Sequence, residues 1–124
     1  MKEFLALIPA RECSKGLKGK NILKFNKKPL IYWTIKEALK SKYIDDIAVS
    51  SDSSKIERYC KNFKKINFLK RPKKFAKDNS TMFDLVNYVV NFQIKKKYKY
   101  LIILQPTSPL RTSKDIDSSC KIIL

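Results

Sequence analysis

The residues best suited to chemistry lie between Ile8 and Asn21, directly after a short apolar run. Both glycines of the protein, Gly16 and Gly19, lie in this stretch. Glycine lets backbone N–H groups approach an anion closely, and lysine and arginine supply the opposing charge. The cations here are Arg11, Lys15, Lys18 and Lys20. This composition favours a cradle for a polyphosphate over a basic surface loop, although neither the P-loop nor the dinucleotide-binding glycine pattern is present.

Two further segments could bind a polar ligand. In the run Leu104-Gln-Pro-Thr-Ser-Pro-Leu-Arg111, two prolines stiffen the chain after an apolar stretch. This run either presents Gln105, Thr107, Ser108 and Arg111 to a ligand or is only a turn between a strand and a helix. Arg71, before Pro72, could donate two hydrogen bonds at once to a base carbonyl or a phosphate, or pair with a surface carboxylate.

Two other residues have a chemical interpretation and a simpler structural one. Asp52 could ligate magnesium, but a helix cap is favoured because Ser54 and Glu57 follow at the spacing of a capping box. Cys13 lies among cations, which favour a thiolate, but incidental placement is the preferred interpretation.

The elements that must position these residues alternate between apolar strands and amphipathic helices, which predicts an α/β fold with three layers. Strands are expected at 3–8, 46–50, 66–69 and 100–104, the last with the continuous apolar run of a strand buried on both faces. Helices are expected at 29–40, from 54 to about 62, and after the capping patterns Thr81-x-x-Asp84 and Thr112-x-x-Asp115. The predicted apolar faces are Ile31, Thr34, Ile35, Ala38 and Leu39 in the first helix, and Leu85, Val86, Val89 and Val90 in the third.

Ligands of open α/β sheets bind beyond the carboxyl ends of the strands. The segments expected there are 9–21, 51–53, 70–80 and 105–111. The three candidate motifs should therefore converge on one site.

Composition limits the remaining possibilities. The 124 residues suffice for one domain, and the absence of histidine excludes Ser-His and Cys-His catalysis within them. Three widely spaced cysteines do not form a disulfide framework or a zinc site, so a reducing cytoplasm is expected. No apolar run is long enough for a membrane helix, and we expect no signal peptide. The net charge of +17 is spread over short lysine clusters, which favours solvated surface over a nucleic-acid partner.

Taken together, three motifs closely resemble those of the acylneuraminate cytidylyltransferases, which include the CMP-sialic acid synthetases and their bacterial relatives. The motifs are Ile8-Pro-Ala-Arg-x-x-Ser-Lys-Gly-x-x-x-Lys-Asn21, Arg71-Pro72 with Asp78 downstream, and Leu104-Gln-Pro-Thr-Ser-Pro-Leu-Arg111. Their order and spacing agree along the whole chain, which corresponds to the N-terminal half, or somewhat more, of such an enzyme. The resemblance implies a Rossmann-like nucleotidyltransferase fold with a mainly parallel sheet. Residues 1–124 would be the N-terminal part of a longer family domain, incomplete at the C-terminus.

The resemblance also implies a reaction and roles for individual residues. CTP and a nonulosonic acid would give the CMP-sugar and pyrophosphate with Mg²⁺, in an enzyme that is a possible homodimer at full length. Arg11 and Lys20 would be catalytic, acting with Ser14, Lys15 and Gly16 on the CTP phosphates, and Asn21 would bind the nucleotide. Arg71 and the segment around Ser80 would address the cytosine. Gln105, Thr107 and Ser108 would face the sugar acid, and Arg111 would be structural.

Two departures from the family bear on these expectations. Glu12 and Cys13 stand where the family usually has glycine, and Glu12 adds negative charge beside the proposed phosphates. The acidic residues that hold Mg²⁺ in the family lie beyond Leu124, so the expected set of metal ligands in this chain is empty. Three alternatives therefore stay open: a nucleotidyltransferase for another sugar, an inactive truncated nucleotide-binding fragment, and a basic nucleic-acid-binding domain.

Overall fold

A computed structural model describes residues 2–11, 13–14, 17–18, 24–25, 27–77, 79–106 and 111–123; for residues 2, 13–14, 17–18 and 24–25 it describes the backbone alone. The four main strands are β1 (Lys2–Pro9), β6 (Asp46–Ser51), β7 (Ile66–Lys70) and β8 (Tyr98–Ile103). The helices are α1 (Leu30–Lys40), α2 (Ser54–Cys60), α3 (Met82–Tyr88) and α4 (Ser113–Ile123). A 3₁₀ turn, η2 (Lys73–Phe75), precedes α3, and a π-helical turn, η3 (Val89–Gln93), continues it.

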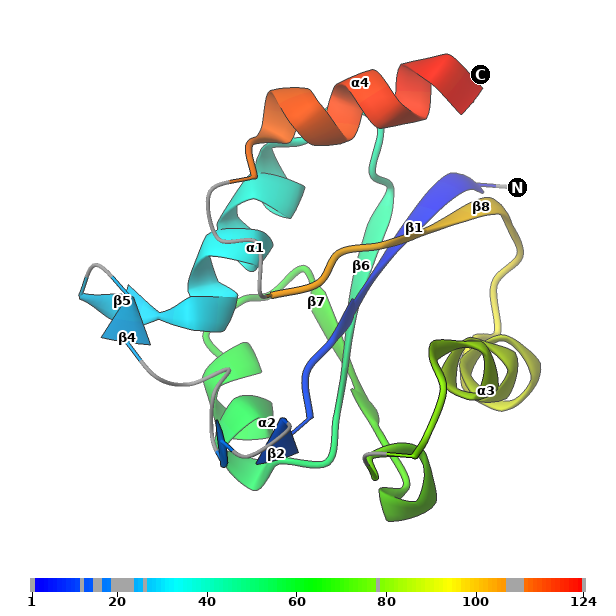
Figure 1. Cartoon of the computed structure of the whole chain (residues 1–124). Coiled ribbons are helices and arrows are strands. Elements are labelled where there is room, and N and C mark those ends of the chain that lie inside the picture. Colours follow the sequence, from blue (N-terminus) through cyan, green and yellow to red (C-terminus); the bar gives the residue numbers. More distant parts are fainter. Residues whose placement is uncertain are drawn as a thin grey trace.

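The main sheet is parallel, with the strand order β7-β6-β1-β8 (Figure 1). Ala6 of β1 pairs with Ile47 of β6 on one side and with Ile102 of β8 on the other, and Val49 of β6 pairs with Phe68 of β7. Strand β1 lies in the interior of the sheet, between β6 and β8. Every residue from Phe4 to Ala10 is therefore buried. The α/β fold with a mainly parallel sheet is thus confirmed.

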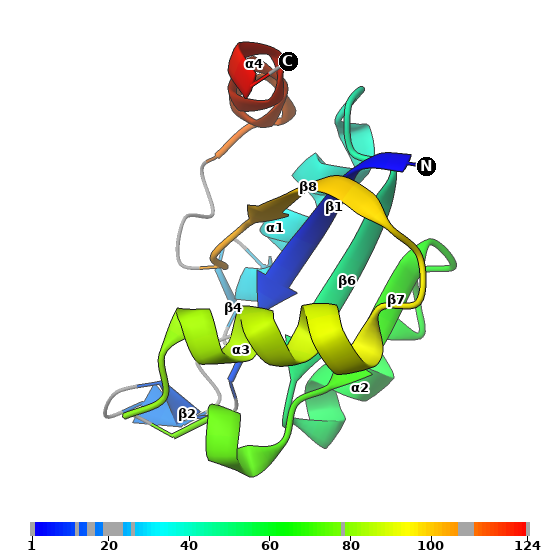
Figure 2. The ribbon, with the colours of Figure 1, turned by 90° about the vertical axis from the view of Figure 1, so that its right-hand side faces the viewer.

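Helices cover both faces of the sheet and complete the three layers. In Figure 2, α3 crosses the front of the sheet, with α1 and α2 behind it. The face toward α1, α2 and α4 buries Phe4, Ala6 and Ile8 of β1. The opposite face buries Leu5 and Leu7 against α3. Alternate residues of β1 therefore supply two separate cores, as the period of two in a strand requires.

Hydroxyl and carboxylate side chains cap the N-termini of three helices. The Thr81 hydroxyl accepts from the Asp84 N–H at 3.0 Å, and Thr112 and Asp115 form a reciprocal capping box, so both predicted starts are confirmed. Helix α2 begins at Ser54, as predicted, but the predicted capping box of Ser54 with Glu57 is wrong. The cap of α2 is Ser53, whose hydroxyl accepts from the Ile56 N–H at 3.3 Å, and α2 ends at Cys60.

Three predictions of burial are also wrong. Leu39 is 39% exposed and Val90 is 51% exposed, because the neighbouring layers do not reach those positions. Strand β8 is not buried on both faces: among the described strands it pairs with β1 alone, and Leu101, Ile102 and Ile103 are only half-buried.

The chain between β1 and α1 contains short strands that were not predicted. β2 (Cys13–Ser14) pairs with β3 (Leu17–Lys18), and β4 (Lys24–Phe25) pairs with β5 (Lys28–Pro29), both antiparallel. Lys27 has φ of 71°, the left-handed conformation that a tight hairpin turn requires, in a position without glycine. The stretch proposed as a phosphate cradle therefore begins with a small hairpin directly after β1. Among the described residues, no helix is both long and apolar enough to cross a membrane.

We expect iodoacetamide at pH 8 to alkylate Cys60 ~100-fold more slowly than an unstructured thiol, because only the thiolate reacts. Cys60 is a free thiol that is 3% exposed. Burial, with a smaller contribution from Glu57, raises its pKa from 9.0 to about 11. Mass spectrometry of the alkylated peptides over time measures the rate, and the protein unfolded in urea is the control. Equal rates in the two samples would contradict this expectation.

Candidate functional site

The four main strands end at one edge of the sheet, because they are parallel. Arg11 follows β1, Asp52 follows β6, Arg71 follows β7 and Gln105 follows β8. In Figure 2, β1 points toward the side where the hairpin strand β2 lies. Three predicted site residues, Arg11, Arg71 and Gln105, therefore share the carboxyl edge of the sheet, where open α/β folds bind ligands.

Among the cations at this edge whose side chains the structure describes, Arg71 is the most deeply buried, since it is 5% exposed. Its backbone N–H donates to the Ser51 carbonyl at 2.8 Å, which extends the pairing of β7 with β6. Its side-chain Nε donates to the Phe75 carbonyl, also at 2.8 Å. Burial, with a smaller contribution from Arg11 and against the opposing effect of Asp52, lowers the pKa of Arg71 to about 10. Even at that pKa the guanidinium is charged at neutral pH, so the fold holds a buried positive charge here.

Arg11 follows β1, is half-buried, and contacts the loop that begins after Arg71. Its Nη1 donates to the Ala76 carbonyl at 3.3 Å. The two arginines thus bind consecutive carbonyls, those of Phe75 and Ala76, and each lies within the electrostatic field of the other. Two guanidinium groups in a partly buried setting repel one another, and an anion between them would relieve that repulsion. This arrangement is suited to binding a phosphate or another polyoxygen anion.

The loop 72–80 that joins the arginines has its own internal hydrogen bonds. The Phe75 N–H donates to the Pro72 carbonyl and the Ala76 N–H to the Lys73 carbonyl, each at 2.9 Å. The Ser80 hydroxyl donates to the Lys74 carbonyl at 2.7 Å and accepts from the Lys77 N–H at 3.2 Å. The loop is therefore closed at its far end by a side chain that was predicted to lie near a bound nucleotide.

Asp52 supplies the negative charge at this edge. It was predicted to cap the following helix, but Ser53 provides that cap. The field of Asp52 instead acts on Arg71, the cation at the end of the neighbouring strand. In the free protein, Asp52 therefore compensates part of the positive charge that an anionic ligand would neutralise.

Gln105 and Arg111 lie at the end of β8. Gln105 is exposed, and its backbone carbonyl accepts from Arg111 Nη2 at 3.3 Å. Burial lowers the pKa of Arg111, and Asp115 opposes that effect. This contact joins the two ends of the proline-containing segment, which agrees with the structural role expected for Arg111.

Several predicted site residues lie outside the described residues, and the convergence of the site is untested for them. They are Lys15, Gly16, Lys20, Asn21, Thr107 and Ser108. Ser14 is described by its backbone alone, as the end of β2.

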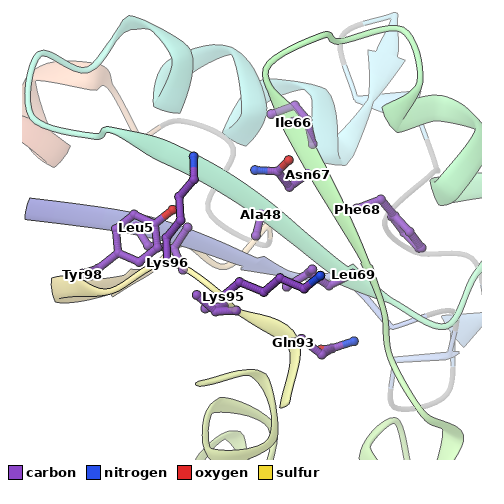
Figure 3. Close-up of a pocket in the computed structure, with 11 residues that line it drawn as sticks. Leu5, Ala48, Ile66, Asn67, Phe68, Leu69, Gln93, Lys95, Lys96 and Tyr98 are labelled. Carbon is purple, nitrogen blue, oxygen red and sulfur yellow. The ribbon is translucent and has the colours of Figure 1, made fainter. Parts of the chain in front are cut away.

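A hollow of about 420 Å³ lies elsewhere, on the side of the sheet that α3 covers. Its lining comes from β1, β6, β7, the end of η3, the stretch after η3 and the start of β8, and includes Leu5, Asn67, Gln93, Lys95 and Tyr98 (Figure 3). Ile66 and Tyr98 are the first residues of their strands, so the hollow opens toward the amino ends. Because none of the predicted site residues lines it, we do not assign the ligand to this hollow.

The acceptors that fix the two arginines are not visible in the sequence motifs. These are the main-chain carbonyls of Phe75 and Ala76. Every residue carries a carbonyl, so no residue type marks such a position in a sequence. The only local signal is Pro72, which makes a turn after β7 plausible.

The described residues do not by themselves form a metal centre. No three acidic, cysteine or histidine side chains of this part of the chain come together. A single carboxylate such as Asp52, next to two arginines, is a poor site for a hard divalent cation, which prefers several oxygen ligands. We therefore assign no residue of the described part to Mg²⁺.

Comparison with known proteins supplies the family. The family model described as "Cytidylyltransferase" matches residues 5–123. N-acylneuraminate cytidylyltransferase of Escherichia coli O18:K1:H7 is 35% identical over 120 residues, which are 97% of this chain and 28% of that protein. CMP-N,N'-diacetyllegionaminic acid synthase of Legionella pneumophila is 35% identical over 124 residues, covering 96% of this chain and 52% of that protein. The chain therefore spans between about a quarter and about a half of the length of these curated relatives.

Solved structures share the fold at lower identity. CMP:2-keto-3-deoxy-manno-octonic acid synthetase, solved in complex with CTP, matches 98% of this chain and 47% of its own, with a TM-score of 0.77 and 22% identity. A manganese complex of Rv0371C from Mycobacterium tuberculosis matches 98% of this chain and 59% of its own, with a TM-score of 0.72 and 8% identity. At these identities the likeness shows the fold alone.

Proposed function

Because this chain belongs to the cytidylyltransferase family, we propose that it transfers CMP from CTP to a sialic-acid-like nonulosonic acid and releases pyrophosphate. The observation that carries this proposal is the pair Arg11 and Arg71, held by consecutive carbonyls at the carboxyl edge of the sheet. Relatives named for N-acylneuraminate and for N,N'-diacetyllegionaminic acid support the choice of acceptor. Since the chain spans only part of their length, residues 1–124 would be the N-terminal part of the family domain.

The reaction needs little covalent work from the protein. The anomeric hydroxyl of the acceptor attacks the α-phosphorus of CTP, a P–O bond forms, and the bond to the pyrophosphate leaving group breaks. Negative charge builds on the phosphoryl oxygens and on the leaving group, so fixed cations and correct positioning supply the catalysis. Arg11, placed beside the loop 72–80, would act on the triphosphate as a catalytic residue together with Lys20.

The remaining roles follow the position of each residue in the motifs. Ser14, Lys15 and Gly16 would bind the phosphates, and Asn21 would bind the nucleotide. Arg71 and the segment around Ser80 would bind the cytosine, on the side of the edge that β7 forms. Gln105, Thr107 and Ser108 would face the sugar acid beyond β8. A divalent ion, proposed as Mg²⁺, would contribute neutralisation of phosphate charge when bound.

Nucleotide preference tests this function. We expect CTP to raise the melting temperature and to bind by isothermal titration at least ~10-fold more tightly than ATP or GTP, because binding to the folded state alone stabilises a protein. Inorganic tripolyphosphate is the control for charge without a base. Equal affinity for CTP, ATP and GTP would contradict the assignment of a cytidylyltransferase site to this chain.

A further inference from the structure

We propose that Ser80 is a positioning residue, which holds the loop 72–80 so that Arg11 faces the triphosphate and Arg71 faces the base of the same bound nucleotide. This inference rests on the proposed function, because it assigns the two arginines to a bound nucleotide. It concerns the Ser80 hydroxyl in particular, whose partners are all atoms of the loop backbone.

The Ser80 hydroxyl is already engaged in both directions. A serine hydroxyl has one hydrogen to donate and two lone pairs to accept with. The hydrogen is donated to the Lys74 carbonyl at 2.7 Å, and one lone pair accepts from the Lys77 N–H at 3.2 Å. Donation to a ligand would therefore require the short bond to Lys74 to break.

The partner of Ser80 is directly connected to the acceptors of the arginines. Lys74 precedes Phe75 and Ala76, whose carbonyls accept from Arg71 and Arg11. Hydrogen bonds close the turn at the Phe75 and Ala76 amides, so a shift of the Lys74 carbonyl is resisted by, and passed on to, the peptide units next to it. The bonds from Phe75 to Pro72 and from Ala76 to Lys73 make the three residues one turn. The chain of contacts therefore runs from Ser80 through three consecutive carbonyls to both guanidinium groups.

Ser80 could either contact the base or position the arginines, and these two roles predict different effects on the binding of CTP and of tripolyphosphate. A residue that contacts only the base would matter for CTP and not for inorganic tripolyphosphate, which has no base. A residue that positions the arginines would matter for both ligands, because both carry the phosphates that Arg11 would bind. The comparison of these two ligands in one variant therefore separates positioning from contact.

The experiment measures the dissociation constants of CTP and tripolyphosphate by titration calorimetry in wild type, Ser80→Ala and Ser80→Thr. We expect Ser80→Ala to raise both constants by a similar factor of roughly 5 to 10, the size of one or two lost hydrogen bonds. Ser80→Thr retains a hydroxyl and should stay within about 2-fold of wild type. Ser54→Ala, at an exposed serine of α2, is the matched control and should change neither constant.

Amide hydrogen exchange supplies a readout that does not depend on ligand. Ser80→Ala should speed exchange at the Phe75 and Ala76 amides, which close the turn, while exchange in β1 stays unchanged. Unchanged exchange in β1 also shows that the variant is folded.

The remaining outcomes would overturn either the positioning role of Ser80 or the proposed function. A loss for CTP alone would overturn the proposal in favour of direct contact with the base, and no loss for either ligand would overturn it outright. If wild type binds neither ligand, the proposed function fails, and the exchange experiment alone decides the positioning role. Unchanged exchange at Phe75 and Ala76 would then overturn that role as well.

Discussion

Replacing Arg71 with alanine is expected to weaken CTP binding by about 1.5 to 3 kcal/mol, the contribution of a hydrogen bond made by a charged group. This corresponds to a factor of roughly 10 to 150 in the dissociation constant. Arg71 is 5% exposed, and its side chain is oriented by the bond from Nε to the Phe75 carbonyl. A base carbonyl that meets it is therefore held away from water, where the charge of the donor counts most. Titration calorimetry with CTP measures the loss.

Two further variants test whether the loss of CTP affinity is specific to Arg71. Arg58→Ala removes an exposed arginine of α2 and should leave CTP affinity within about 2-fold of wild type, because exposed charges contribute little. Arg71→Lys retains the charge but lacks the Nε donor and the planar fork, so it should recover less than half of the lost free energy. Near-wild-type affinity of Arg71→Ala would remove Arg71 from the site.

Replacing Phe4 with alanine is expected to lower the free energy of unfolding by about 3 to 5 kcal/mol, the usual cost of truncating a buried phenylalanine. Phe4 is 1% exposed and lies on β1, the interior strand that carries Arg11 at its far end. Its ring lies 5.1 Å from the Tyr100 ring and 6.5 Å from the Tyr43 ring. A domain of this size has roughly 5 to 15 kcal/mol of stability in all, so the loss is a large share of it.

Urea denaturation followed by circular dichroism measures this change, and a second phenylalanine provides the control. Phe83 of α3 is 77% exposed, so Phe83→Ala should change stability by no more than about 0.5 kcal/mol. Equal losses at Phe4 and Phe83 would contradict the layer arrangement. A smaller loss in Phe4→Leu than in Phe4→Ala is also expected, because leucine fills more of the cavity.

The starts of the helices illustrate how far local patterns can be trusted. Thr81 and Thr112 cap their helices as predicted, and each hydroxyl accepts from the N–H of the acidic residue three positions further on. Before α2, by contrast, Ser53 and Ser54 are adjacent and chemically identical. Which hydroxyl reaches the free N–H depends on where β6 ends and how the chain turns, which the local sequence does not specify.

The burial of individual side chains was less predictable than the positions of the helices and strands. Periodicity correctly identified Ile31, Ile35 and Leu85 as core residues, but it gave Leu39 and Val90 the same status. A repeat of apolar residues shows which side of a helix faces inward, and it does not show how far the neighbouring layer extends. For the same reason the apolar run of β8 did not reveal its position at the edge of the described sheet.

The residue types alone were sufficient to establish the order of the four main strands and the four helices, the cationic loop after the first strand and the motifs that the chain has in common with a known family. These features are local, since each depends on neighbours within a few positions. The proximity of Arg11 to Arg71 is different, because Arg11 and the Ala76 carbonyl that it binds are separated by 65 positions. This proximity follows from the order β7-β6-β1-β8 and from the hydrogen bond between the Arg71 N–H and the Ser51 carbonyl. Strand order depends on packing across the whole sheet, and only the folded chain shows which carbonyls the two guanidinium groups bind.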